Sequence, residues 1–168
     1  IKAESVILVG RPAEEIIDYA EKEDVGLIVM ATHGRSGIRR WALGSVAYKV
    51  VRATKRPVIL IRAKGARPDI REKGILKRAL VPLDGSKESE AVLPYIEELA
   101  SKLKAEIILL HMLAKEHIIY SLQRLEELAS LRASGKDYIE KVAAQLKQRR
   151  IAAKADFREV VMGSEAQE

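Results

Sequence analysis

The sequence predicts an α/β fold, in which a parallel β-sheet carries helices on both faces. Short apolar, β-branched runs alternate with helical periodicity along the 168 residues. Several runs are continuously apolar, the pattern of parallel strands buried on both faces. Cysteine is absent, which excludes disulfide scaffolds, thiolate metal sites and cysteine nucleophiles. No apolar run approaches the roughly 20 residues that a membrane-spanning helix needs, so we expect no membrane partner and a cytoplasmic location.

Residues 1–63 are expected to form a β-α-β-α-β unit. Pro12 suits the first turn of a helix, where its missing N–H costs nothing. Helical spacing after the second strand points Val46, Val50 and Val51 inward. The expected elements are a strand at Val6–Val9, a helix at Pro12–Lys22, a strand at Leu27–Ala31, a helix at Ser45–Thr54 and a strand at Pro57–Ile61.

Residues 64–76 are polar and contain Gly65, Pro68 and Gly74, as in a linker. The alternation then restarts over residues 77–168, where Ser86 is a suitable helix cap. The expected elements are a strand at Leu80–Leu83, a helix from Ser86 to about Leu103, a strand at Ile107–Met112, a helix over residues 117–150 broken near Ser134–Gly135, and a strand at Phe157–Met162.

The end of the chain repeats its beginning, because residues 162–168 (MGSEAQE) match residues 9–15 (VGRPAEE). A repeat about one domain length later indicates tandem copies. We therefore expect a fragment, in which 1–63 is the C-terminal half of one copy and 77–168 the N-terminal half of the next. The halves would form one composite domain, circularly permuted within a chain or swapped between two chains. One third-strand copy, Val6–Val9 or Phe157–Met162, is then surplus, and a homodimer is expected.

Charge is unevenly distributed, although the 30 basic and 24 acidic residues sum to only +6. Residues 31–64 contain arginine and lysine but no acid, which suits nucleotide phosphates, nucleic acid or an acidic protein surface. A solvated helix face is the alternative. Trp41 and Tyr48 are the only aromatic residues there, too few for a base-stacking platform, so nucleic acid is not expected.

Four segments carry a resemblance to a known family: ATHGRSGIRRWALGS at 31–45, RALVPLD at 78–84, ILLHM at 108–112 and GRPAEE at 10–15. Together they resemble the universal stress protein family, in its ATP-binding branch. The resemblance implies a doubly wound, parallel five-stranded sheet that is Rossmann-like and similar to the adenine nucleotide alpha hydrolases. It also implies tandem copies and a homodimer that pairs through the last strand of the sheet.

A phosphate-binding loop is expected between the Leu27–Ala31 strand and the following helix. Gly34 can adopt the positive φ that turns backbone N–H groups toward an anion. Gly44 and Ser45 open a helix, whose free N–H groups and dipole favour phosphate. The family's glycine spacing fits Gly34 and Gly44–Ser45, although Ala31 stands where its first glycine is expected. The resemblance also places His33 and Val46 at this site.

Asp84 is the second candidate, directly after the strand Leu80–Leu83. The resemblance implies that its carboxylate binds the ribose hydroxyls, with Pro82 and Leu83 as one wall of the site. It also implies that Met112 packs on the adenine and that Met30 lines the same pocket. The alternatives are an Asx turn at Asp84, since Asp-Gly is a common turn pair, and ordinary core packing for the methionines.

The sequence thus predicts a regulatory stress-response module that binds ATP and has at most weak ATPase activity, with Mg²⁺ arriving on the nucleotide. No catalytic residue and no metal site are expected, and His111 is expected to be a hydrogen-bonded core residue. One alternative is a nucleotide-free structural member of the family. Another is an adenylyl-transferring enzyme. Such enzymes carry a Ser-Gly-Gly-rich loop after the first strand, and residues 83–87 (LDGSK) do not match it.

Overall fold

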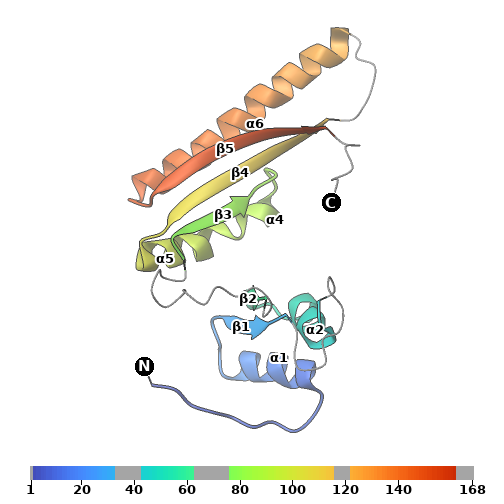
Figure 1. The fold of residues 1–168 in the computed structure, drawn as a ribbon, viewed down its shortest axis with the longest axis vertical. Helices are drawn as coiled ribbons and strands as arrows, with labels where there is room; N and C mark the ends of the chain where they lie inside the picture. The colour runs from blue at the N-terminus through green and yellow to red at the C-terminus, as the bar shows by residue number, and fades with distance from the viewer. Residues whose placement is uncertain (1, 33–42, 63–75, 116–121, 162–168) are drawn as a thin grey trace. The chain divides into compact units, whose positions relative to one another are not determined.

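The structure is a computed structural model that describes residues 2–32, 43–62, 76–115 and 122–161. The chain divides into two compact units, one within residues 1–69 and one within residues 70–168 (Figure 1). Both units are α/β with parallel strands, which confirms the predicted fold class. No described helix is long and apolar enough to cross a membrane.

The first unit packs two helices against a two-stranded parallel sheet, in which Ile28 lies opposite Val58. One cluster joins both helices to this sheet: Ala13, Ala20, Ile28 and Val50 are buried. The elements are α1 (Pro12–Lys22), β1 (Ile28–Ala31), α2 (Ser45–Ala53) and β2 (Val58–Ile61).

The prediction of a strand at Val6–Val9 is wrong for this unit, because these residues form no strand. Ile7 and Val9 are more than nine-tenths exposed. A strand needs a neighbour for its N–H and C=O groups, and within the described part of this unit β1 pairs only with β2. An apolar sequence alone therefore does not make this segment a strand.

The prediction that Leu27–Ala31 is buried on both faces is also wrong here. Ile28 is buried, but Val29 is 59% exposed because α1 and α2 pack on the other face of the sheet. On α2, Val50 is fully buried as predicted, whereas Val51 is exposed. Successive helical residues differ by about 100° in direction, and this turns Val51 away from the core.

The second unit is a three-stranded parallel sheet in the order β3-β4-β5. Helices α5 and α6 cover one face of the sheet (Figure 1), over the fully buried Ile107 and Leu109. The elements are β3 (Arg78–Pro82), α4 (Lys87–Glu90), α5 (Leu93–Leu103), β4 (Glu106–Lys115), α6 (Leu122–Gln148) and β5 (Ala153–Val161).

Two helix predictions in this unit need correction. The helix after Ser86 is split into α4 and α5, because Pro94 has no N–H to donate to the Glu90 carbonyl and its ring crowds that turn. The helix predicted to break near Ser134–Gly135 is continuous through both residues. Gly135 is buried there, against the rings of Phe157 and His111. This glycine permits close packing and does not end the helix.

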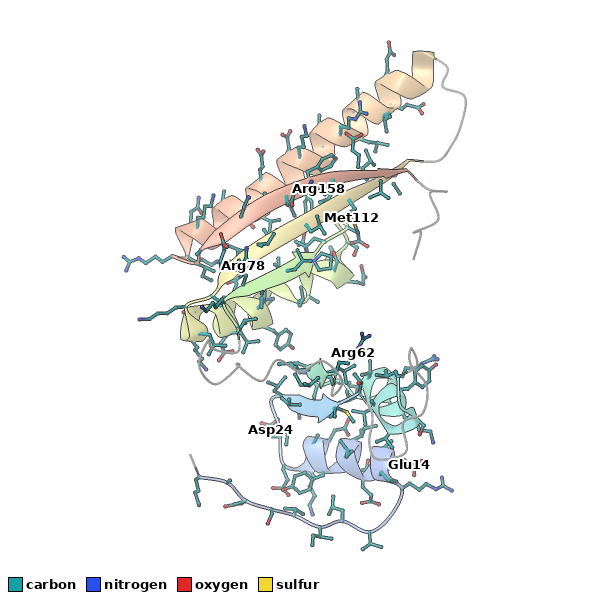
Figure 2. The ribbon with its side chains drawn as sticks, in the orientation of Figure 1. Glu14, Asp24, Arg62, Arg78, Met112 and Arg158 are labelled. Carbon is teal, nitrogen blue, oxygen red and sulfur yellow. The ribbon has the colours of Figure 1, made fainter. Side chains whose placement is uncertain are left out.

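The other face of the three-stranded sheet has no described helix on it. Leu80 on β3 is 61% exposed and Met112 on β4 is 54% exposed. Met112 lies opposite Arg158 of β5 in the register, and Figure 2 labels both. Each unit therefore covers one face of its own sheet and leaves apolar side chains on the other.

Candidate functional site

Asp84 lies in a tight turn between the carboxyl end of β3 and the start of α4. The backbone N–H of Ser86 donates to Asp84 Oδ1 at 2.9 Å, and the Ser86 hydroxyl donates to the same oxygen at 2.6 Å. Ser86 also caps α4, accepting from the Ser89 N–H at 3.1 Å. The Asx-type turn therefore forms, and it fixes an exposed carboxylate at the end of a parallel strand.

These hydrogen bonds keep the Asp84 carboxylate ionised. The Ser86 hydroxyl, then the Ser86 N–H and the Ser89 side chain, hold the pKa of Asp84 well below its usual range. A carboxylate of such low pKa accepts hydrogen bonds over the whole neutral range but is a weak base. The turn therefore presents an ionised carboxylate that can accept hydrogen bonds from hydroxyl groups.

The wall predicted around Asp84 forms in part. Leu83 is buried and its N–H donates to the Leu110 carbonyl at 2.8 Å, which extends the β3–β4 ladder past Pro82. Pro82 itself is exposed. Met112 lies two residues beyond Leu110, further toward the carboxyl end of β4, where β4 pairs with β5, and it is exposed on the open face.

In the first unit, the two ends of the predicted phosphate loop are joined. The Thr32 N–H donates to the Ile61 carbonyl at 2.9 Å, and the Gly44 N–H donates to the Thr32 carbonyl at 2.9 Å. Gly44 is the N-cap of α2, and Ser45 is its exposed first residue. The structure thus brings the exposed Ala31, at the carboxyl end of β1, close to the N-terminus of α2.

The remaining predicted residues of this unit differ in their surroundings. Met30 and Val46 pack, partly buried, against the small core, so the ordinary packing expected as their alternative is present. His33 and Gly34 lie outside the described residues. The predicted site residues that the structure describes form one group in each unit.

A cluster behind the Asp84 turn was not predicted from the sequence. His111 was expected to be hydrogen-bonded, and its Nδ1 lies 2.8 Å from the Leu83 carbonyl oxygen. The Tyr138 ring meets the His111 ring edge-on at 5.5 Å between centroids, and the Tyr138 hydroxyl donates to Glu90 Oε1 at 2.9 Å. Burial and the Glu90 carboxylate raise the pKa of Tyr138 to about 12. Tyr138 is the one aromatic residue in the sequence of α6, and this was the available signal.

The basic character of residues 31–64 is partly accounted for by local contacts. Arg52 donates to the Tyr48 hydroxyl at 2.7 Å, and Arg56 pairs with Asp24 at 2.9 Å. No group of three or more acidic or histidine side chains placed to hold a metal ion occurs among the described residues.

The sequence profile of the Universal stress protein family matches residues 1–62 and 76–168. A universal stress protein of Methanocaldococcus jannaschii is 37% identical over 65 residues, which cover 39% of this chain and 40% of that protein. The protein YxiE of Bacillus subtilis, also a universal stress protein, is 39% identical over 62 residues, covering 37% of this chain and 42% of that protein. The chain thus spans about 40% of the length of these relatives.

Solved structures show the same fold at low sequence identity. A functionally unknown protein of Pseudomonas aeruginosa aligns with a TM-score of 0.61 at 15% identity, over 94% of this chain and 50% of that one. A universal stress protein of Archaeoglobus fulgidus aligns with a TM-score of 0.55 at 20% identity, over 89% of this chain and 47% of that one. With a profile match on both sides of residues 63–75, the chain belongs to the universal stress protein family.

Proposed function

We propose that this protein binds an adenine nucleotide, ATP with its Mg²⁺, and acts as a regulatory module in a stress response. The observation that carries the proposal is the Asp84 carboxylate, exposed at the carboxyl end of β3 and fixed there by Ser86. In open parallel sheets, ligands bind outside the carboxyl ends of the strands, and an acidic side chain there receives ribose hydroxyls. Asp84 is ionised and can accept such hydrogen bonds.

The N-terminus of α2 supports a phosphate subsite. Its free N–H groups and helix dipole favour negative charge, and the first turn of α2 contains no acidic residue that would repel phosphate. The exposed Ser45 hydroxyl adds a donor. Ala31, which replaces the family's first glycine, carries only a methyl group there.

The proposed site takes residues from both halves of the chain, so it requires them to join. We propose that β1 and β3 pair and form one composite five-stranded sheet, within one chain or by exchange between two chains of a homodimer. The apolar side chains left open in each unit support this, with Val29 59% and Leu80 61% exposed. Within the described residues, β1 and β3 each pair with a single strand. Ile61 on β2, 45% exposed, suits the alternative dimer through the last strand.

Little or no hydrolysis is proposed for the bound nucleotide. The proposed role of the Asp84 carboxylate is at the ribose hydroxyls and not at the reacting phosphate, and the hydrogen bonds from Ser86 lower its pKa and so its strength as a base. Binding without turnover would make the nucleotide a regulator of the fold or of a partner.

The test is a calorimetric titration of the whole chain with Mg–ATP, compared with Asp84→Asn. The variant is expected to bind at least about 10-fold more weakly, since it loses charge-assisted hydrogen bonds. Asp137→Asn, an exposed aspartate on α6, is the matched control and should bind like the parent. Equal affinity of the parent and Asp84→Asn would contradict the role of Asp84. No binding by the parent would favour the nucleotide-free alternative.

A further inference from the structure

The peptide group that joins Leu83 to Asp84 is held at both of its polar atoms. Its carbonyl oxygen, on Leu83, lies 2.8 Å from His111 Nδ1. Its N–H, on Asp84, donates to Ser89 Oγ at 3.4 Å. A carbonyl oxygen only accepts hydrogen bonds, so His111 Nδ1 carries the proton. Because a peptide group is planar, His111 fixes the direction in which the chain enters Asp84.

The position of the His111 ring is set by α6 and β5. The Phe157 ring stacks on it at 5.9 Å between centroids with planes 23° apart, and Tyr138 of α6 meets it edge-on. At Gly135, a Cβ would lie 3.0 Å from His111 Cδ2, so the α6 backbone closes directly on the imidazole. A displacement of α6 therefore moves the ring that holds Leu83.

A second connection runs from α6 to the far side of the turn. The Tyr138 hydroxyl donates to Glu90 Oε1, on the last residue of α4, at 2.9 Å. Ser86, which caps α4, donates twice to the Asp84 carboxylate. Helix α6 thus contacts the residue before Asp84 through His111 and the helix after it through Tyr138.

We propose that His111 and Tyr138 are positioning residues, which transmit the placement of α6 to the Asp84 carboxylate and so set nucleotide affinity. This inference rests on the proposed nucleotide-binding function. Any partner that moves α6 would change the affinity of the site, without touching the nucleotide.

The test is a calorimetric titration of the full chain with Mg–ATP in four forms: parent, His111→Leu, His111→Asn and Tyr138→Phe. His111→Leu removes the donor to Leu83 and is expected to weaken binding about 10-fold. His111→Asn places an amide donor near the Nδ1 position and should restore affinity to within about 3-fold of the parent. Tyr138→Phe keeps the ring, loses the bond to Glu90 and should weaken binding about 3-fold.

Hydrogen exchange of the ligand-free chain supplies the second measurement. The amides of Ser86 and Ser89 report the turn, and the Ile107 amide, bonded to the Ala152 carbonyl at 2.8 Å, reports the sheet. His111→Leu should speed exchange at both serines while Ile107 stays protected; equal acceleration at all three amides would mean a merely structural role and overturn the inference.

The two proposals fail in different ways. If the parent binds Mg–ATP and the four forms bind equally, the positioning role is wrong and the proposed function stands. If the parent does not bind, the proposed function is wrong, and the amide exchange of the turn alone decides whether His111 positions Asp84.

Discussion

Replacing Gly135 by alanine is expected to destabilise the second unit, although glycine to alanine usually stabilises a helix by about 1 kcal/mol. The added Cβ would lie 2.8 Å from Phe157 Cε2 and 3.0 Å from His111 Cδ2. Carbon atoms pack best at about 3.5–4.0 Å, so both rings must move. Overpacking of this kind costs about 1–3 kcal/mol. The net effect is a decrease of about 1 kcal/mol in the free energy of unfolding.

Urea unfolding of the full chain, followed by amide exchange of β4 to isolate the second unit, measures this loss. Ser134→Ala, an exposed neighbour on the same helix, is the control and should gain a few tenths of a kcal/mol. A Gly135→Ala variant about 1 kcal/mol more stable than the parent would refute the reasoning, because the α6 backbone would then not close on the two rings.

Four further predictions concern charge, ionisation and packing. Ser45→Glu should stabilise α2 by about 0.3–1 kcal/mol, since it adds the acid that the first turn lacks; a lower melting temperature would contradict this. Tyr138 has its pKa raised from 10.0 to about 12 in the folded state, so its contribution to stability is complete below pH 10 and is lost as pH rises from 10 to 12. Tyr138→Phe should flatten that part of the stability–pH curve, and an unchanged curve would count against the raised pKa. Leu109→Ala should cost about 2–5 kcal/mol in urea unfolding because Leu109 is fully buried. Leu80→Ala should lower the free energy of unfolding by more than about 0.5 kcal/mol, the value typical of a surface position, since the composite sheet would cover Leu80. A smaller decrease would contradict the composite sheet.

Elements whose signals are local were predicted well from the sequence. The helix Pro12–Lys22 has the same bounds in the structure, because proline at its start and apolar spacing along it lie within the segment. The Asx turn at Asp84 was only the alternative to a ribose-binding role, yet it too arises from adjacent residues, since Ser86 supplies both the cap and the donors.

Features that depend on distant partners were not predictable in this way. Whether Val6–Val9 forms a strand depends on a neighbour that the segment itself does not encode. A glycine within a helical pattern often indicates a break, but Gly135 permits close packing against Phe157, which lies on another element. Likewise, the contact of Tyr138 with Glu90 joins residues 48 positions apart, and no local spacing indicates it.

The central claim is that both halves of the chain contribute to one nucleotide site. The most direct measurement is the dissociation constant of Mg–ATP for the parent, Ser45→Glu and Asp84→Asn, with folding checked by circular dichroism. The first variant places negative charge at the proposed phosphate subsite, and the second removes it from the proposed ribose subsite. The account predicts that each variant binds at least about 10-fold more weakly than the parent. Loss of affinity in only one of the two variants would contradict a site shared by both halves.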